Sequence, residues 1–548
     1  MTDRLSARET LALVTDDTTF TELPYPARES KPDGPLAWQG YDASRARAAD
    51  RTGESESVIC GTATVSGTQA VLIAFEFGYL GGSLGERTGD RLEAAYTYAR
   101  EHRLPVVPLV ATGGSRMQEG MIALTQLQRV ARQSVLTREA GLPQIAVLRD
   151  PTTGGGWATL GAGADVILAL PGAQVGFAGS RVRPPDADPT AYTAEAQVAA
   201  GAADAVVEPE QLKETLGRWL RLLTTPWGGQ APVPAALDRS TQHTLAGPST
   251  TARDAVQDAG SAQHTNVDLP STERDAVEDF GLAQHSGTDL PESARGAAED
   301  SGPARHAEAD LPGIGRDAER RDRSTQRTPA GPPVPAQEAV QRVAADLPAT
   351  GWEAVQRARS PQRPRAASYL DAYFTHRLAI SGDRCGGTDA GMLCGFGERE
   401  GRTVAYAAQA GTATRPAGYR TAARLIRLAG RLGIPVLTLV DTPGAANDAE
   451  AERQGAGAAI ADLFGAVASA RTPLTTLLIG EGGSGGALAL AAPGNTWATP
   501  DSYFSVIAPE SAAAILKRPP EEAASTADQL HIRPQDLAEL GVIRTRPV

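Results

Sequence analysis

Two stretches of the chain share one order of apolar and polar segments. In the first, the apolar run "LPVVPLV" is followed by "ATGGSRMQEG", an amphipathic segment, the run "LPQIAVLRD" and the glycine cluster "PTTGGG". In the second, "GIPVLTLV", "DTPGAAN", another amphipathic segment, "TPLTTLLIG" and "EGGSGG" follow in the same order. Short apolar runs that alternate with amphipathic segments predict buried strands separated by helices. Both stretches are therefore predicted to form α/β domains.

The spacing within the two stretches is also the same. Pro105 precedes Pro143 and Pro435 precedes Pro473 by equal distances (143 − 105 = 473 − 435 = 38), and a glycine cluster follows each second proline. The shared order of strand, loop, helix, strand, glycine loop, helix and strand indicates that one structural unit occurs twice.

The sequence between the two stretches has a different composition. From 240 to 350 the only aromatic residue is Phe280. Three units that begin at Arg253, Arg274 and Arg295 repeat every 21 residues (274 − 253 = 295 − 274 = 21), and each contains a histidine. A segment with so few large apolar side chains cannot offset the entropy that it would lose on ordering. We interpret it as a duplicated low-complexity linker rather than as a solenoid or a metal-binding array.

The overall composition narrows the class of protein. The chain of 548 residues has a formal net charge of −13, which argues against a nucleic-acid or anionic-membrane partner. Cys60, Cys385 and Cys394 form no C-x-x-C pair, so neither a disulfide framework nor a zinc knuckle is expected. The N-terminus lacks a signal-type apolar core, and no apolar run approaches the roughly 18 residues of a membrane span. The expected location is the cytoplasm.

The two glycine clusters, "DPTTGGG" and "EGGSGG", are the main candidates for chemistry. Glycines between a strand and a helix allow positive φ and a close approach of the backbone to a ligand. The helix that follows directs free N–H groups and its positive dipole end toward the same point. Such loops suit a phosphate or a developing oxyanion. Close packing of a helix on a strand is the alternative explanation, but two loops at matching places favour a binding role. Neither loop fits a Walker A or a Rossmann motif.

A serine hydrolase is a second interpretation of the later cluster. Ser484 lies in G-x-S-x-G, and Asp501 and His531 follow in the order expected of an α/β-hydrolase. Asp501 follows Ser484 very closely for that fold, and His531 lies near the start of a predicted terminal helix. Backbone amides that stabilise an enolate are therefore the preferred chemistry.

Longer motifs resemble a known family. "GGSLGERTGDRLEAAYTYAREHRLPVVPLVATGGSRMQEG" and "GLPQIAVLRDPTTGGGWATLGAGADVILALPGAQVGFAGSRV" resemble the β subunit of bacterial acetyl-CoA carboxylase carboxyltransferase. "GYRTAARLIRLAGRLGIPVLTLVDTPGA", "LIGEGGSGGALALAAPGNTWATPDSYFSVIAPE" and "IRPQDLAELGVI" resemble its α subunit. The matches cover residues 55–225 and 380–545. The chain thus resembles a β–α fusion.

The resemblance implies a fold and a set of domain limits. It implies two α/β domains of the crotonase-like class, each built from repeated ββα units and joined by the repeat-containing linker. The expected limits are 1–54 for an N-terminal extension without a zinc ribbon, 55–230 for a β-type domain, 231–365 for the linker and 366–548 for an α-type domain.

The resemblance also implies a reaction. Carboxybiotin on a separate carrier protein loses CO2, and the biotin anion takes the α-proton of an acyl-CoA such as acetyl-CoA. The enolate then captures the CO2 to give malonyl-CoA or a homologue. Two oxyanion holes stabilise the charges, one at the thioester oxygen and one at the ureido oxygen of biotin. The amides expected to form these holes belong to Gly154, Gly155, Gly485 and Gly486.

Further residues are expected to bind the substrate by the same resemblance. They are Gly113, Gly114, Arg116, Gly156, Arg420, Gly444, Gly482, Gly483 and Ala487. The implied partners are a biotin carboxyl carrier protein and a biotin carboxylase, since the chain has no A-M-K-M sequence for biotin attachment. A homodimer is expected, because active sites of this family lie between a β-type and an α-type domain that often belong to different chains. The linker is long enough for pairing within one chain or between two.

Several departures from the family pattern leave specificity open. Residues 1–50 contain no cysteine, so no metal is expected, and the α-type motif "DTPGAYPG" is replaced by "DTPGAANDA". "FAGPRV" is replaced by "FAGSRV", and the basic loop before "GYRTA" is shortened, which leaves Arg415 and Arg420. Both the acyl chain and the direction of the reaction stay open, and a malonyl- or acyl-CoA decarboxylase of the same fold is the alternative enzyme.

Overall fold

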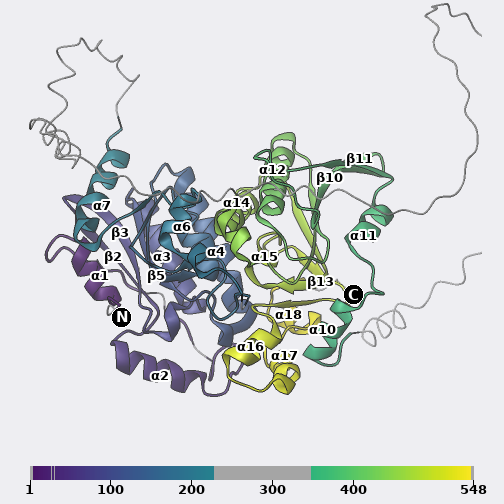
Figure 1. The fold of residues 1–548 in the computed structure, drawn as a ribbon, viewed down its shortest axis with the longest axis horizontal. Coiled ribbons are helices and arrows are strands. Elements are labelled where there is room, and N and C mark those ends of the chain that lie inside the picture. Colours follow the sequence, from purple (N-terminus) through teal and green to yellow (C-terminus); the bar gives the residue numbers. More distant parts are fainter. Residues whose placement is uncertain (1–3, 26, 30, 185, 227–346, 545–548) are drawn as a thin grey trace, which may run out of the picture. The chain divides into compact units, whose positions relative to one another are not determined.

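The chain forms two lobes, each built on one β-sheet (Figure 1). The computed structural model describes residues 4–25, 27–29, 31–184, 186–226 and 347–544. We call residues 4–226 the first lobe and 347–544 the second lobe; both belong to one compact unit. The 21-residue repeats and most of the expected linker lie outside the described residues.

The first lobe holds an eight-stranded sheet in the order β1-β2-β3-β4-β5-β6-β8, with β7 paired to β5. Its strands are β1 (Thr21–Glu22), β2 (Val58–Val65), β3 (Thr68–Phe75), β4 (Val106–Thr112), β5 (Ile145–Thr153), β6 (Val166–Ala169), β7 (Val175–Gly176) and β8 (Ala205–Val206). Its α-helices are α1 (Ala7–Val14), α2 (Tyr41–Thr52), α3 (Glu86–Glu101), α4 (Gly120–Glu139), α5 (Gly154–Gly156), α6 (Ala194–Ala199) and α7 (Pro209–Thr224). Short 3-10 or π turns are η1 (Leu80–Gly82), η2 (Met117–Glu119), η3 (Trp157–Gly161) and η4 (Pro189–Tyr192).

The second lobe holds a seven-stranded sheet in the order β14-β13-β12-β11-β10-β9, with β15 paired to β13. Its strands are β9 (His376–Ile380), β10 (Met392–Arg399), β11 (Arg402–Gln409), β12 (Val436–Thr442), β13 (Leu474–Gly483), β14 (Thr496–Ala498) and β15 (Tyr503–Ser505). Its helices are α10 (Gly351–Arg359), α11 (Ala366–Tyr373), α12 (Pro416–Leu432), α13 (Ala449–Arg453), α14 (Ala456–Ala468), α15 (Ser484–Leu488), α16 (Pro509–Ile515), η5 (Pro520–Glu522), α17 (Ala523–Gln529) and α18 (Pro534–Glu539).

The two lobes follow the same plan. In each, an antiparallel hairpin (β2–β3 and β10–β11) is followed by parallel strands that continue through β4 and β5, or through β12 and β13. The register shifts at the same place in both sheets, between Val110 and Thr112 and between Val440 and Thr442. The predicted α/β class with two crotonase-like domains of ββα units is therefore confirmed.

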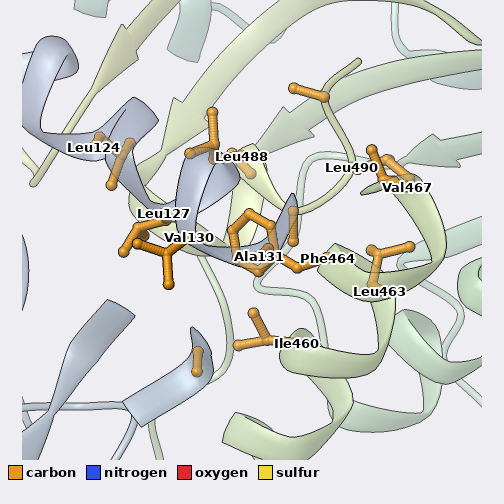
Figure 2. Packing of buried hydrophobic residues seen from close by; sticks show 14 of the residues in the cluster. Leu124, Leu127, Val130, Ala131, Ile460, Leu463, Phe464, Val467, Leu488 and Leu490 are labelled. Carbon is orange, nitrogen blue, oxygen red and sulfur yellow. The ribbon is translucent and has the colours of Figure 1, made fainter. Parts of the chain in front are cut away.

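One apolar core joins the two lobes. Leu124, Leu127 and Val130 on α4 pack into a cluster with Ile460 and Phe464 on α14 (Figure 2). Leu488 on α15 lies in the same cluster. An amphipathic helix buries its apolar face wherever a partner face is offered, and here the partner of α4 comes from the other lobe.

A tryptophan and a glycine mark the tightest contact between the lobes. The Trp157 side chain is fully buried, and a methyl group placed on Gly457 would lie 1.9 Å from its Nε1 atom. The second residue of α14 is therefore a glycine because the indole ring of the first lobe occupies the space of a side chain.

The described segments outside the two expected domains are integral parts of the lobes. Strand β1 pairs with β2, and α1 begins with a capping box in which Ser6 and Glu9 satisfy each other's backbone amides. Residues 351–359, which we expected in the linker, form α10, whose first amide donates to Asp528 Oδ1 at 2.5 Å. The second lobe therefore begins earlier than the expected limit at 366.

Two features are absent from the described residues. No helix there is long and apolar enough to cross a membrane. Nor do three or more histidine, cysteine, aspartate or glutamate side chains gather in that part of the chain as a metal site would require.

We expect Gly457→Ala to destabilise the protein by about 1–3 kcal/mol, the usual cost of overpacking a core. The new methyl group would overlap the fully buried indole ring of Trp157, which would have to shift within the core. Gly465→Ala in the same helix is the matched control, since a methyl group there meets nothing within 4 Å. The control is expected to raise stability by about 0.5–1 kcal/mol. Denaturant unfolding of both variants checks this, and equal effects would contradict the packing argument.

Candidate active site

Each predicted glycine loop lies at the carboxyl end of a parallel strand. Strand β5 leads into Gly154–Gly156 (α5), and β13 leads into Ser484–Leu488 (α15). The chain turns through a left-handed residue at both junctions, Gly154 with φ 65° and Ser484 with φ 54°. Only glycine adopts this conformation without strain, so the loop of the second lobe carries a strained serine where the first lobe has a glycine.

A second loop of the same design supports each glycine loop. Gly114 follows β4 and donates its amide to Thr112 Oγ1 at 3.0 Å, and Gly444 follows β12 and donates to Thr442 Oγ1 at 3.1 Å. Gly444 follows Gly114 by 330 residues, and Ser484 follows Gly154 by the same number (444 − 114 = 484 − 154 = 330). The duplicated order seen in the sequence therefore extends to individual hydrogen bonds.

Each glycine loop packs so closely on its supporting loop that a side chain would not fit between them. A methyl group on Gly154 would lie 3.1 Å from the Cα atom of Gly114, and one on Gly483 would lie 1.9 Å from the carbonyl oxygen of Pro443. Backbone packs directly on backbone at both places, which holds the amides of the two loops in fixed positions.

The two glycine loops meet at one leucine side chain. A methyl group on Gly155 would lie 2.4 Å from Leu127 Cδ1, and one on Gly485 would lie 3.5 Å from the same atom. The Phe177 ring is also close, with Cζ 3.6 Å from that position on Gly485. Gln128, next on α4, donates to the carbonyl oxygens of Leu488 at 3.3 Å and Ala491 at 2.9 Å. Helix α4 thus brings the loops of both lobes together within one chain.

The loop amides differ in what they contact. Gly154 donates its N–H to the carbonyl oxygen of Phe177 at 3.2 Å. The amides of Gly155 and Gly485 lie in first helical turns, where an N–H has no intrahelical acceptor. Neither amide has another acceptor in the part of the chain that the structure describes. Among the predicted donors, Gly155 and Gly485 fit an oxyanion better than Gly154 does.

A buried ion pair anchors the strand below the second loop. Asp441 is fully buried and accepts from Arg363 Nη2 at 2.6 Å and from the backbone amide of Glu481 at 3.2 Å. Arg363 belongs to the segment that we expected to be linker. The entry to the second lobe therefore fixes the strand that carries the glycine loop.

Arg116 lies in a network of its own. Its side chain is 1% exposed and donates to Glu56, at 2.5 Å, and to the carbonyl oxygen of Ser83, at 2.7 Å. Burial opposes the charge, but Glu56 and Glu119 raise the pKa of the Arg116 guanidinium well above its ordinary value. Arg116 in turn holds the pKa of the buried Glu56 carboxyl at about 2. The arginine that we expected to bind substrate therefore bonds to groups of the protein instead.

The other predicted residues differ in exposure. Gly113 is exposed, Gly444 is half-buried, and the following are buried: Gly114, Gly156, Gly482, Gly483, Gly486 and Ala487. Arg420 is half-buried and donates to Asp383 Oδ2 at 2.8 Å and to the carbonyl oxygen of Gln454 at 3.0 Å. Both of these partners belong to the second lobe.

The hydrolase interpretation finds no support in the geometry. Within the described residues no hydrogen bond joins Ser484 to a histidine, and none joins Asp501 to His531. The left-handed turn at Ser484 reproduces the one at Gly154, so it belongs to the duplicated loop design rather than to a nucleophile.

Sequence reasoning missed the residues that support the loops. Leu127 and Phe177 look like ordinary core residues in the sequence, and nothing marks them as neighbours of both loops. Thr112 and Thr442 carried a signal, because each precedes a loop glycine in the spacing T-x-G. That shared spacing identifies the supporting loops once the duplication is recognised.

The fold and the duplicated glycine loops fit an acyl-CoA carboxyltransferase, and comparisons with known proteins show this class. Residues 37–205 match the carboxyl transferase domain, and residues 335–545 match the acetyl co-enzyme A carboxylase carboxyltransferase-like family. The fused β/α carboxyl transferase subunits of acetyl-coenzyme A carboxylase from Salinispora arenicola are 33% identical, over 98% of this chain and 81% of that protein. The chain belongs to the acetyl-CoA carboxylase carboxyltransferase family, with β-type and α-type parts in one polypeptide.

Separate subunits match the two lobes individually. The β subunit of Leuconostoc citreum is 44% identical over 33% of this chain and 62% of that protein. The α subunit of Methylobacterium sp. (strain 4-46) is 44% identical over 33% of this chain and 61% of that protein. Among solved structures, transcarboxylase 12S aligns with a TM-score of 0.34 at 17% identity, over 98% of this chain and 86% of that chain.

Ser484→Gly and Gly154→Ser form a reciprocal test of the loop design. Ser484→Gly removes the strain of a left-handed serine, so we expect unchanged or higher stability and retained acyl-CoA turnover. Gly154→Ser introduces that strain, about 1–2 kcal/mol, and a contact with Gly114, so we expect it to destabilise. Denaturant unfolding and an activity assay measure both. Complete loss of activity in Ser484→Gly would contradict the loop design and restore the hydrolase interpretation.

Proposed function

We propose that this chain transfers a carboxyl group from biotin, held on a separate carrier protein, to the α-carbon of acetyl-CoA or a related acyl-CoA. The observation that carries the proposal is the meeting of two glycine loops at Leu127, each with a first-turn amide that has no acceptor among the described residues. The names of the relatives, which describe acetyl-coenzyme A carboxylase subunits, support acetyl-CoA as the acyl substrate.

The chemistry requires two separate sites for negative charge. The Gly155 amide would stabilise one oxyanion and the Gly485 amide the other, on the thioester oxygen and on the ureido oxygen of biotin. An amide held in place before the reaction stabilises developing charge without a reorganisation cost. The backbone-to-backbone packing of both loops supports such a fixed position.

The surroundings of the loops suit the same chemistry. Leu127 and Phe177 place apolar groups beside Gly485, and hydrogen bonds to charge are stronger where water is excluded. Biotin, when bound, would supply the carboxyl group and the base for the α-proton. The chain itself would bind and orient the acyl group and hold the two oxyanions.

We assign the other predicted residues by their geometry. The residues proposed to shape the acyl-CoA pocket are Gly113, Gly114, Gly156, Gly444, Gly482, Gly483 and Ala487, and Arg420 is proposed to contact the substrate from the second lobe. The Gly486 amide is proposed to stabilise an oxyanion beside that of Gly485. The buried Arg116 is proposed to position the loop after β4, since its donors are already used. A biotin carboxyl carrier protein and a biotin carboxylase are the proposed partners, and a homodimer the proposed assembly.

The proposal is tested with purified protein, malonyl-CoA and free biotin or biocytin. We expect acetyl-CoA and carboxylated biotin to form together, and turnover to depend on biotin. Release of CO2 at the same rate without biotin would contradict the proposal and identify a decarboxylase of the same fold.

We expect Gly485→Val to lower kcat by about 10²- to 10³-fold, the usual loss when one oxyanion donor is removed or displaced. The added side chain enters the space between the loop and the Leu127 and Phe177 side chains. Gly430→Val is the matched control, because a Cβ atom on this helix glycine meets nothing within 4 Å. Steady-state kinetics in the biotin assay measures both. Wild-type turnover in folded Gly485→Val would contradict a role for this loop.

A further inference from the structure

A buried carboxylate of the second lobe contacts the backbone of the first lobe. Glu452, on α13, is fully buried. Its Oε1 atom accepts hydrogen bonds from the amides of Phe177 at 2.6 Å and Ala178 at 3.1 Å. The equivalent position in the first lobe is Ile122 (452 − 330 = 122). This carboxylate is therefore not part of the duplicated design.

Phe177 connects that carboxylate to both glycine loops. Its carbonyl oxygen accepts the amide of Gly154 at 3.2 Å, at the start of the first loop. Its ring lies 3.6 Å from the position that a methyl group on Gly485 would take, in the second loop. A shift of the Phe177 backbone would therefore move one loop and change the packing of the other.

The segment around Phe177 has little freedom to shift when Glu452 is in place. A methyl group on Gly176 would lie 3.2 Å from Glu452 Oε1 and 2.9 Å from Tyr192 Cδ1. Farther along, the Tyr192 hydroxyl donates to the carbonyl oxygen of Asn447 at 2.7 Å, and Asn447 Nδ2 donates to the carbonyl oxygen of Val182 at 2.9 Å. Of these contacts from the second lobe, the one from Glu452 reaches the backbone amide of Phe177 directly.

We propose that Glu452 is a positioning residue that couples the two glycine loops by holding the Phe177–Ala178 backbone. Its effect on catalysis rests on the proposed function, whereas its hold on the backbone does not. Oriented binding groups lose catalytic power steeply when they are displaced: a misplacement of about 1 Å costs on the order of 100-fold in rate.

The charge of Glu452 changes near neutral pH. Burial raises the pKa of the Glu452 carboxyl to about 7. The hydrogen bonds from the two amides and the charge of Arg183 act in the opposite direction, because they favour the ionised form. From the first lobe Arg183 and Tyr192 face this carboxyl, with the guanidinium 3.9 Å above the tyrosine ring. Arg453, next to Glu452 on α13, forms an ion pair with Asp188. Asp448, at the N-cap of the same helix, forms one with Arg415.

The sign of the pH effect follows from the hydrogen bonds. An ionised carboxylate accepts amide hydrogen bonds more strongly than a neutral acid does. The hold on Phe177 therefore strengthens as the pH rises through 7.

Glu452→Ala and Glu452→Gln test the proposal, with the exposed Glu450→Gln on the same helix as control. Glu452→Ala is expected to lower kcat by about 10- to 100-fold and to change KM for acyl-CoA by less than about twofold. Hydrogen–deuterium exchange at the Phe177 and Ala178 amides is expected to accelerate in this variant and to stay unchanged in the control.

Glu452→Gln keeps an acceptor oxygen but cannot ionise, so it is expected to recover most of the activity. The ratio of wild-type kcat to that of Glu452→Gln should rise from pH 6 to pH 8, with a midpoint near the carboxyl pKa of about 7. If Glu452→Ala does not fold, the pH dependence of this kcat ratio tests the role of Glu452.

The outcomes separate the two proposals. If the wild-type protein shows no biotin-dependent turnover, the proposed function is contradicted. The hydrogen–deuterium exchange rates of the Phe177 and Ala178 amides then still test whether Glu452 holds this backbone. An active wild type whose Glu452→Ala variant keeps its kcat and its exchange rates overturns the role of Glu452. A kcat ratio that does not change with pH overturns it as well.

Discussion

The contact of helix α4 with the second lobe is the interaction on which the site depends. Leu127 on this helix lies beside both glycine loops, and Gln128 hydrogen-bonds the carbonyl oxygens behind the second loop. A buried leucine contributes about 2–5 kcal/mol when its truncation leaves a cavity. The same side chain therefore stabilises the junction of the lobes and sets the distance between the two loops. Stability and active-site geometry are coupled at this helix.

The duplication gives the protein two similar loops, but the two lobes use different side chains around them. Arg116 and Glu56 form a buried ion pair beside the first supporting loop, whereas Asp441 and Arg363 form one below the second glycine loop. A buried ion pair costs desolvation and is a weak source of stability. Here the ion pairs serve to position the backbone, because directional hydrogen bonds to carboxylates and carbonyl oxygens fix where a strand ends. Glu452 extends this pattern across the junction, since it belongs to one lobe and holds the backbone of the other.

Sequence patterns predicted a large part of this arrangement. The repeated order of apolar runs and the equal proline spacing predicted two α/β domains, and the glycine clusters predicted the strand-to-helix loops at the right residues. These predictions succeed because strand and helix periods and the need for glycine at left-handed positions are local properties. The T-x-G pairs at Thr112 and Thr442 were readable in the same way. Arg116 was harder to interpret, because a sequence does not reveal whether an arginine faces a ligand or a buried glutamate.

By itself, the sequence determined the class of fold, the number of lobes and the backbone design of the loops, since each depends on neighbouring residues and their period. Only the tertiary structure decided which residues surround the loops. Leu127, Phe177 and Glu452 come from segments far apart in the chain, and their contacts arise because two lobes pack along α4 and α13. The structure also decided that the Gly154 amide is used internally while those of Gly155 and Gly485 have no acceptor among the described residues. That difference depends on where Phe177 lies, and long-range packing rather than local sequence fixes its place.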